Sequence, residues 1–364
     1  MSNTEHPFAK YVRTIARGPT LSRPLTAEEA LEATRMILRG EVEPMQLGAF
    51  LCVLRVRTED PGEGEGFVHA VKETIRVPEG AHADLDWSAY AGKKRQLPWF
   101  MLSALLLAGS GVRVLMHGTE GHTPGRVYAR ETLAALGVPV ASSLEDAARQ
   151  IAERNFAYLP LEAFSPRLQE IIELKPIIGV RSPVNTFARM INPFDAPYSI
   201  QSIFHPNYRE IHRDVCLRLG QPHMVVFKGE GGEIERRPEK PVEVQHLHQG
   251  AKSDEEWPAI EGLARPPGGA GRQDRKPGAG SAAGSLDVGA SAPGEETMDL
   301  SRLAALWRGQ DKNPYAEAVV VGTAAIALRL MGRAADPRAA EAEARRLWNA
   351  RPNEILPRAS ARAA

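Results

Sequence analysis

The sequence has no excess of charge of either sign, and this limits the functions that its composition allows. The 364 residues contain 45 Lys and Arg against 45 Asp and Glu, which gives a formal net charge of zero. A dedicated nucleic-acid-binding domain usually carries a basic excess over its whole surface. Any site for a polyanion must therefore be local, with the compensating acidic residues elsewhere in the chain.

Cysteine and long apolar runs are scarce as well. The two cysteines, Cys52 and Cys216, lie far apart, which argues against a disulfide framework or a cysteine metal site and fits a reducing compartment. The apolar runs at residues 100–108 and 316–328 are too short, or too interrupted by Gly and Thr, to cross a bilayer. The opening stretch MSNTEHPFAK lacks the apolar core of a signal peptide. We expect a soluble, cytoplasmic protein with no membrane partner.

What the sequence does have is 43% hydrophobic residues, enough for a sizeable core, and near its start they follow a helical spacing. Thr26 and Glu29 form a capping-box pattern, which predicts a helix that continues to about Leu38. Pro44 suits the first turn of a second helix, and the Gly-rich residues 61–66 predict its end. A third helix is predicted from the apolar stripe Phe67, Val68, Val71 and Ile75.

From about residue 84, strand-like apolar runs alternate with helical stretches. This alternation predicts an α/β fold with a mostly parallel sheet and helices on its faces. Two further helices are predicted over residues 313–330 and 339–348. The alternating segments are residues 112–116, 124–136, 156–159, 166–174 and 224–227.

One internal segment differs in composition from the rest of the chain. Residues 266–294 consist mostly of Gly, Ala, Pro and Ser and contain almost no large apolar side chain. Such a segment cannot bury enough surface to offset the entropy lost on ordering. We expect a disordered insert rather than a domain boundary, because globular patterning resumes at Leu300.

Two loops in the first half of the chain are rich in cations and turn residues. The first, SAYAGKKRQLPW at residues 88–99, contains Lys93, Lys94 and Arg95, and the second reads MHGTEGHTPGR. Between residues 88 and 130 there are six Lys and Arg against one Glu, a local excess of five. A run of three cations is by itself usually a solvated loop. Here the pattern indicates an anion site, either for a phosphorylated small molecule or for a nucleic-acid backbone.

Several motifs, in their order along the chain, resemble one family. They are EPMQLGAFLCVLRVRTED, GVRVLMHG, GVRSPVNTFARMINP and KNPYAEAVVVGTAAIAL. With them the chain is similar to anthranilate phosphoribosyltransferases from about residue 20 to about residue 335. The resemblance implies a helical N-terminal domain over residues 1–80, joined by about 175–200, and an α/β domain over 81–174 and 201–350. It also implies an active site in the cleft between the domains and a homodimer formed through the helical domain.

The motifs that serve phosphoribosyl transfer in that family are altered here. The family's GTGGD turn, whose bare backbone approaches a pyrophosphate, falls on residues 88–92, where Tyr90 places a ring. Its NIST segment falls on residues 98–101, and the phosphate-facing Lys of its KHGN motif falls on Met116. Its magnesium-binding acidic pair is reduced to Glu235. This set of changes resembles the DNA-binding, YbiB-type branch of the family, which lacks the parent activity.

Other positions of the family's site are kept or become more basic. Arg181 aligns with the arginine that contacts the aromatic acid substrate, and Asn185 and Asn192 also match. The family's Gly-Pro pair between them is Ala188 and Arg189 in this chain, which adds a cation to the same region.

We therefore predict a non-catalytic protein that binds DNA or RNA without sequence preference, in a basic cleft between its domains and with no cofactor or metal. Tyr90, Trp99 and Phe100 are candidates for stacking on bases. The apolar helix that follows favours a core position for Trp99 and Phe100, and Tyr90 is left open. The predicted phosphate contacts are Lys93, Lys94, Arg95, His117, Arg126, Arg181, Arg189 and Lys228.

Two other functions remain open at this point. The chain is alternatively a divergent Mg-dependent glycosyl or phosphoribosyl transferase that uses phosphoribosyl pyrophosphate through Glu233, Glu235 and His117. The third possibility is a protein-binding regulator that acts through its N-terminal helices. His122 is expected to titrate near neutral pH, but the sequence places no nucleophile beside it. The missing Gly-rich turn favours nucleic-acid binding over transfer.

Overall fold

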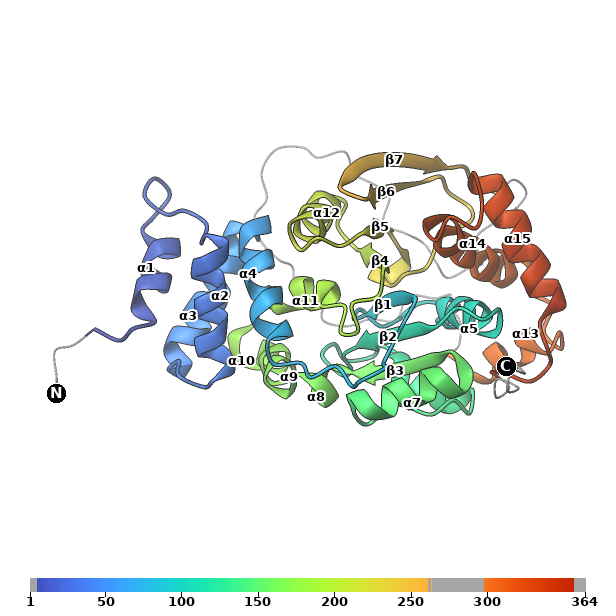
Figure 1. The fold of residues 1–364 in the computed structure, drawn as a ribbon, viewed down its shortest axis with the longest axis horizontal. Helices are drawn as coiled ribbons and strands as arrows, with labels where there is room; N and C mark the ends of the chain where they lie inside the picture. The colour runs from blue at the N-terminus through green and yellow to red at the C-terminus, as the bar shows by residue number, and fades with distance from the viewer. Residues whose placement is uncertain (1–4, 261–262, 264–297, 357–364) are drawn as a thin grey trace.

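The computed structural model describes residues 5–260, 263 and 298–356, so the insert predicted at residues 266–294 lies outside the described residues. The larger part of the chain is built on the strands β1 (Leu85–Ala89), β2 (Val114–Gly118), β3 (Phe156–Pro160), β4 (Tyr198–Ile203), β5 (His223–Lys228), β6 (Val242–His248) and β7 (Ala251–Trp257). They form one sheet with the order β3-β2-β1-β4-β5-β6-β7 (Figure 1). Strands β1 to β5 run parallel, whereas β6 and β7 are antiparallel. The predicted α/β fold with a mostly parallel sheet is confirmed.

Helices cover both faces of this sheet, because successive side chains of its inner strands point to opposite faces and two different apolar cores form there. Trp87 of β1 and Met116 of β2 belong to one core, and Leu115 of β2 belongs to the other. The first core is completed by α5 (Phe100–Gly109), α6 (Ala129–Ala135), α13 (Ser301–Trp307), α14 (Pro314–Leu330) and α15 (Pro337–Ala350). The second is completed by α7 (Leu144–Arg154), α8 (Leu161–Phe164), α9 (Pro166–Glu173), α10 (Lys175–Ile178), α11 (Val184–Phe187) and α12 (Tyr208–Arg218).

Four helices from the start of the chain form a layer at one end of the molecule (Figure 1). The predicted capping box is confirmed, since Thr26 Oγ1 accepts from Glu29 N at 3.2 Å and the Glu29 carboxylate accepts from Thr26 N at 2.9 Å. The helices are α1 (Ala9–Ala16), α2 (Ala27–Leu38), α3 (Pro44–Arg57) and α4 (Pro61–Lys72). This helical N-terminal domain packs beside the larger α/β domain, as the fold class predicts. The exact domain boundary at residue 80 stays a prediction.

The helix end predicted at residues 61–66 is wrong in one respect. Pro61 starts α4, and the glycines of this stretch lie within that helix instead of separating two helices. A Cβ on Gly66 would lie 2.2 Å from the Ala27 carbonyl oxygen, and one on Gly64 would lie 2.6 Å from Val215. Glycine is therefore required there because α4 packs closely against α2 and α12, which a sequence pattern does not show.

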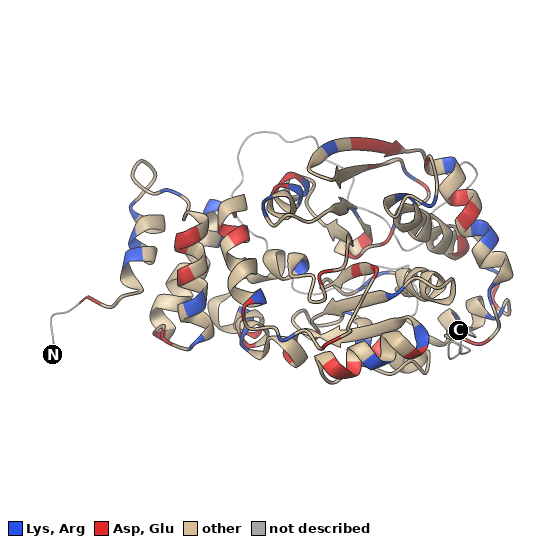
Figure 2. Cartoon of the chain, viewed as in Figure 1, with Lys and Arg blue, Asp and Glu red and all other residues tan. Residues whose placement is uncertain are grey.

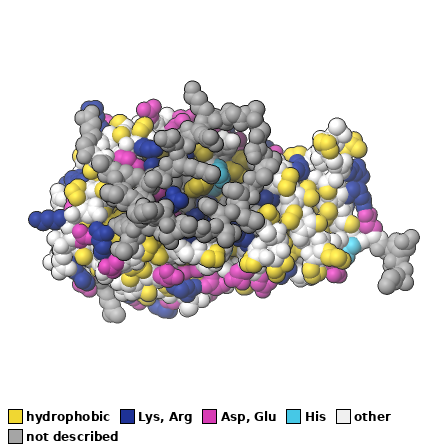
Figure 3. All heavy atoms as spheres, turned by 180° about the vertical axis from the view of Figure 1, so that it is seen from behind, with side chains coloured by type: hydrophobic (Ala, Val, Ile, Leu, Met, Phe, Trp, Pro, Cys, Tyr) yellow, Lys and Arg dark blue, Asp and Glu magenta, His cyan; other side chains and the backbone are white. Residues whose placement is uncertain are grey.

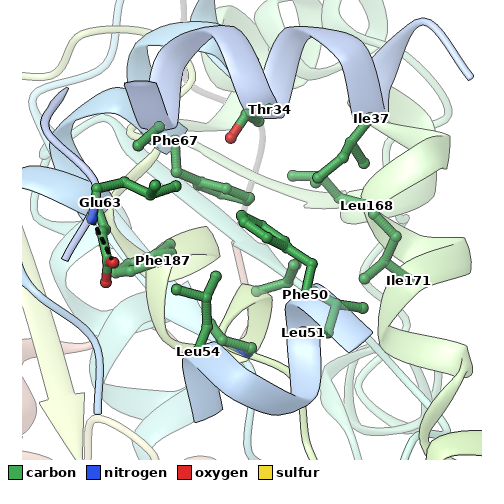
Figure 4. Close-up of a pocket in the computed structure, with 14 residues that line it drawn as sticks. Thr34, Ile37, Phe50, Leu51, Leu54, Glu63, Phe67, Leu168, Ile171 and Phe187 are labelled. Carbon is green, nitrogen blue, oxygen red and sulfur yellow. Dashed lines mark hydrogen bonds between the residues drawn. The ribbon is translucent and has the colours of Figure 1, made fainter. Parts of the chain in front are cut away.

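A small apolar cavity of about 30 Å³ lies inside the helical layer (Figure 4). Phe50 of α3 and Phe67 of α4 lie across it from Leu168 and Ile171 of α9. Glu63 lies at its edge, where its carboxylate accepts from Leu25 N at 3.0 Å. The mid-chain helices therefore share a core with the N-terminal helices. The residues that line the cavity come from both parts of the chain, from Leu25 to Phe187.

Two other features differ from the patterns seen in the sequence. The helix predicted over residues 124–136 begins only at Ala129, because Val127 pairs with Lys93 in an isolated antiparallel bridge. The β6–β7 hairpin was not predicted, since β7 is exposed along most of its length and reads AKSDEEW. No helix in the described ranges has both the length and the apolar character needed to cross a bilayer.

Candidate anion-binding site

The candidate site lies where the strand order of the sheet changes direction. Strand β1 has β2 on one side and β4 on the other, so the chain leaves the carboxyl ends of β1 and β4 toward opposite halves of the sheet. Open α/β sheets bind ligands at such a point. The loop that begins at Tyr90 follows β1, and Phe204 and His205 follow β4. Both loops contribute to a pocket of about 190 Å³ beside the helical domain.

Three arginines from separate elements reach this pocket. Arg55 comes from α3, Arg181 from the loop before α11, and Arg189 from the short 3-10 turn η1 (Ala188–Met190). Arg55 donates to Tyr208 Oη at 2.7 Å and lies 3.6 Å from the Glu59 carboxylate. Both the helical domain and the α/β domain thus contribute side chains to the pocket, and three of these side chains are arginines.

Positive charge accumulates around Arg181 without local compensation. Burial, followed by the nearby charge of Arg126, lowers the pKa of Arg181, and burial with Arg181 and Arg126 lowers the pKa of Lys175. Arg181 Nη2 donates to Thr123 Oγ1 at 3.0 Å, and Lys175 Nζ lies 3.4 Å from the same oxygen. Within the described part of the chain, Arg126, Lys175 and Arg181 form no ion pair with a carboxylate. A bound anion would relieve this repulsion.

Arg126 and Arg189 also hold the loops of the site in place. Arg126 Nη1 donates to the carbonyl oxygens of Ala91 at 3.0 Å and Gly92 at 2.9 Å. Arg189 Nη1 donates to the carbonyl oxygens of Ser202 and Gly232, both at 3.2 Å. Burial lowers the pKa of Arg189. Arg126 thus ties its own loop to the loop after β1, and Arg189 ties the turn η1 to β4 and to Gly232, which follows β5.

The two carboxylates proposed for magnesium are used inside the protein. Glu233 Oε1 accepts from Ala91 N at 2.6 Å and Gly92 N at 2.5 Å, which holds the loop that replaces the family's Gly-rich turn. Glu235 accepts from Lys93 Nζ at 2.5 Å and from Phe100 N at 3.0 Å.

Only Glu233 Oε2 remains without a hydrogen bond in this pair of carboxylates, and it is buried. Burial raises the pKa of both carboxyl groups. Magnesium binding needs several accessible oxygen ligands, and no group of three His, Cys, Asp or Glu in the described residues is placed to hold a metal. The residues present therefore do not fit a magnesium ion.

The predicted phosphate contacts separate into three groups. Arg181 and Arg189 line the pocket, Arg126 lies next to them, and Lys228 is half-buried at the end of β5. Lys94 and Arg95 are exposed and form no ion pair with any residue that the structure describes. Lys93 and His117 are buried, with side chains 1% and 0% exposed, so in this conformation they face no ligand.

His117 instead belongs to a buried polar network beneath the loop after β1. Its Nδ1 lies 2.8 Å from Tyr90 Oη, and its Nε2 lies 3.2 Å from Asp86 Oδ1. Asp86 in turn accepts from Ser199 Oγ at 2.9 Å. The expectation that His122 titrates near neutral pH is wrong, because burial lowers its pKa to about 4.

Sequence reasoning missed several residues of the site. Arg55 lies in a predicted amphipathic helix, and Lys175 lies in a helical stretch, so neither carries a signal of its own. Phe204 and His205 follow an apolar strand that was not predicted. Trp99 and Phe100 lie in the core as favoured, and Tyr90, which was left open, is buried as well.

The fold and this site together define a two-domain α/β protein whose ligand pocket lies between a sheet and a helical bundle. The helical bundle domain of a glycosyl transferase family matches residues 9–75, and the α/β domain of such a family matches residues 101–261. The chain belongs to this glycosyl transferase family.

Individual relatives agree with this assignment. An uncharacterized protein of Aquifex aeolicus is 30% identical over 245 residues, which cover 66% of this chain and 74% of that protein. An anthranilate phosphoribosyltransferase of Syntrophomonas wolfei is 28% identical over 235 residues, 64% of this chain and 67% of its own. The crystal structure of anthranilate phosphoribosyltransferase from Thermus thermophilus matches with a TM-score of 0.75 and 23% identity over 96% of each chain. This last likeness shows the shared fold.

Proposed function

We propose that this protein binds the phosphate backbone of nucleic acid, without sequence preference and without catalysis, at the cationic pocket between its domains. The observation that carries the proposal is the group Arg126, Lys175 and Arg181, which has no carboxylate partner in the described residues and in which burial and the neighbouring cations lower the pKa of Arg181 and of Lys175. A preformed group of uncompensated cations gains the most from binding phosphates, which also release counterions. Backbone contacts of this kind carry no sequence information.

The internal use of the acidic residues argues against phosphoribosyl transfer. Glu233 and Glu235 hold the loop after β1 and are buried, and Lys93 neutralises Glu235. A transferase of this fold would need those oxygens for the metal that neutralises pyrophosphate. This arrangement supports placing the chain in the DNA-binding, YbiB-type branch and favours a binding protein over an enzyme.

Lys94 and Arg95 extend the proposed contact surface beyond the pocket, since both are exposed on the loop after β1. A strand held at Arg181 would then continue toward these side chains. Lys93 is left out of the proposed contacts, because it is enclosed with Glu235. Arg126 and Arg189 contribute charge and hold the loops.

A homodimer in the cytoplasm is part of the same proposal. The helical domain exposes large apolar side chains, namely Leu21, Met45 and Val56. Figure 3 shows hydrophobic side chains over much of this domain on the face turned away from Figure 1. Basic side chains gather at its outer end, where Lys10, Arg13 and Arg17 are exposed (Figure 3). Pairing through the apolar residues would place two cationic pockets in one particle, which increases avidity for a long polyanion.

The proposal is tested by fluorescence anisotropy of a labelled oligonucleotide across a salt series. We expect affinity to fall steeply with salt. Arg181→Ala is expected to weaken binding and to lower the log–log salt slope by about 0.7, because one phosphate of a single strand is no longer neutralised. The matched control is Arg149→Ala, an exposed arginine of α7 that pairs with Asp146 in its own helix. No binding by the wild-type protein at low salt would refute the proposal.

A second function has one observation in its favour. The pocket of about 190 Å³ is small enough for a single small substrate, and Arg181 and Asn185 line it. The resemblance assigns the aromatic acid of anthranilate phosphoribosyltransferases to Arg181. Calorimetry with phosphoribosyl pyrophosphate, with and without Mg²⁺, distinguishes the two functions. Magnesium-dependent, saturable binding supports a transferase, and no binding of this compound supports the nucleic-acid protein.

A further inference from the structure

One aromatic side chain at the cationic pocket lies outside the apolar cores. All ten Phe and five Trp of the sequence lie in the described residues, and Phe204 is the only one of them that is exposed, with 56% of its surface accessible. Phe204 lines the pocket together with Arg55 and Arg181. A single exposed apolar side chain is common on protein surfaces, so the position of this ring in a pocket lined by arginines is the informative observation.

The backbone beneath Phe204 is held from several sides. Phe204 directly follows β4, and its Cβ would lie 3.5 Å from a Cβ built on Gly232, whose carbonyl oxygen accepts from Arg189. The His205 ring meets the Phe204 ring edge-on, with centroids 4.9 Å apart and an interplanar angle of 83°. The turn then runs through Pro206 into α12. The Phe204 ring thus contacts the His205 ring, while more than half of the residue's surface stays accessible.

The charges around this ring suit a polyanion that carries flat apolar groups. Burial and then Arg55, Lys228 and Arg181 lower the pKa of His205, which places three cations within electrostatic reach of the residue next to Phe204. Proteins that bind single strands combine such a positive groove with aromatic rings on which bases stack. In a duplex the bases are already stacked on one another, so none is free to cover this ring.

We propose that Phe204 is a stacking platform for an unpaired nucleobase, so that single-stranded nucleic acid is the preferred ligand of the cationic pocket. This inference rests on the nucleic-acid binding proposed above. It replaces Tyr90, Trp99 and Phe100, the three aromatic residues that the sequence offered for stacking, since all three are buried. Stacking tolerates any base, which agrees with binding without sequence preference.

The test compares three labelled probes on the full chain: a thymidine single strand, a strand of equal length with abasic sites, and a duplex. We expect the thymidine strand to bind most tightly. Phe204→Ala is expected to weaken its binding by about 5- to 100-fold and to leave the salt slope unchanged, because the variant keeps every cation of the pocket. Phe204→Leu, which keeps an apolar side chain without a ring, is expected to behave like Phe204→Ala.

Phe204→Trp supplies a rescue and a second signal. The five natural Trp residues are buried, so a Trp at this exposed position would respond separately to a base stacked on it. We expect Phe204→Trp to bind the thymidine strand at least as well as the wild-type protein, with quenched emission, and to show no quenching with the abasic strand. Thermal melting of each variant confirms that the exposed position tolerates the change.

The outcomes separate this inference from the proposed function. If the wild-type protein binds the abasic strand or the duplex as tightly as the thymidine strand, the stacking platform is overturned and backbone binding stands. Equal affinity of Phe204→Leu and the wild-type protein also overturns it. If the wild-type protein binds none of the three probes at low salt, the proposed function itself has failed.

Discussion

At the pocket, His205 is a side chain whose charge we expect to respond to a bound anion. Burial and the cations Arg55, Lys228 and Arg181 lower its pKa, so the free protein carries this imidazole neutral at neutral pH. A phosphate bound among these cations offsets their charge and raises the pKa of His205 again. The complex then takes up a proton that the free protein does not carry, and binding strengthens as pH falls.

We therefore expect the dissociation constant for an oligonucleotide to decrease between about pH 8 and about pH 6, by at most about tenfold per pH unit for one proton taken up. Calorimetry in two buffers with different heats of ionisation counts this proton. His205→Asn is expected to bind with much less pH dependence. Proton uptake that persists in His205→Asn would show that another group is responsible.

The run of three cations after β1 is expected to divide into two kinds of residue. Lys93 is buried against Glu235, so Lys93→Ala leaves a buried carboxylate without its partner and is expected to cost about 3–5 kcal/mol of unfolding free energy. The exposed pair is expected to differ: Lys94→Ala/Arg95→Ala changes stability by only about 0.5 kcal/mol. Urea unfolding measures both variants.

Oligonucleotide binding provides the complementary measurement. Lys94→Ala/Arg95→Ala is expected to lower the salt slope by about 0.7 for each phosphate of a single strand that the two side chains neutralise in the wild-type protein. Equal stability losses in both variants would contradict the division. A sequence shows three adjacent cations, but burial of the first depends on Glu235, which lies 142 residues away.

Single residues of the site were predicted unevenly for a physical reason. Arg126 was identified from the local excess of cations, and Arg181 and Arg189 from the family resemblance; all three lie at the pocket or beside it. Phe204 was missed because a phenylalanine beside an apolar strand usually belongs to the core. Whether such a side chain faces the core or solvent is decided by how β4 joins α12, and no local pattern records that junction.

Among the elements, α4 shows how packing dictates a glycine within a helix. A Cβ on Gly66 would lie 2.2 Å from the Ala27 carbonyl oxygen and 2.6 Å from Leu31 N, both backbone atoms of the α2 region. Because backbone cannot move aside as a flexible side chain does, Gly66→Ala must separate α2 from α4. We expect it to lower the unfolding free energy by about 1–3 kcal/mol or more, measured by urea unfolding.

Gly48 in α3 is the matched control. A Cβ there meets nothing within 4 Å, and the residue lies inside a helix. Gly48→Ala is expected to raise the unfolding free energy by about 0.5–1 kcal/mol, because alanine loses less backbone entropy than glycine on folding. A destabilised Gly48→Ala, or an unaffected Gly66→Ala, would be evidence against this account of the helix pair.

Elements were predictable wherever their signal is local. Each of the correct predictions depends on residues that are close in the sequence. They are the capping by Thr26 and Glu29, the proline at the start of α3 and the alternation of strands with helices. The helix end predicted at residues 61–66 was wrong because the glycines there are required by close packing of α4 against α2 and α12. These two helices lie elsewhere in the sequence. The β6–β7 hairpin was not predicted because β7 is an edge strand with exposed charged side chains and no apolar alternation. Such charges also protect the edge of a sheet from pairing with other chains.

Across the whole molecule, zero net charge does not mean that every charged side chain has a partner beside it. Figure 2 shows acidic residues on β7, at the edge of the sheet, where Asp254, Glu255 and Glu256 follow one another. Of the cations without a carboxylate partner in the described residues, Arg181 lines the pocket, and Arg126 and Lys175 lie near it. If this pocket binds an anion as proposed, a local group of cations would direct the anion to it, whereas a uniformly basic surface would bind it anywhere.

The stability of the molecule should depend on pH through two buried histidines. Burial lowers the pKa of His122 to about 4 and that of His212 to about 3. Their folded-state pKa values lie below the ordinary value of about 6.5. Between these pKa values and about pH 6.5, the unfolded chain therefore binds more protons than the folded chain. Their contribution is therefore lost as pH falls below about 6.5. The buried Glu63, Glu233 and Glu235 and the half-buried Glu120 act in the opposite direction, since desolvation raises their pKa values.

Because these groups oppose one another, the contribution of one histidine is best measured as a difference between two pH profiles. The neutral His212 ring donates through Nδ1 to Gln201 Oε1 at 2.8 Å, and His212→Asn keeps an amide donor without a titrating group. Between about pH 7.5 and about pH 5, the variant is expected to lose about 2 kcal/mol less unfolding free energy than the wild-type protein. Urea unfolding at a series of pH values measures both. Parallel profiles would mean that His212 is protonated in the folded protein about as easily as in the unfolded chain. Gln201 would then not hold the ring in its neutral form, and the buried face of β4 would have to admit water.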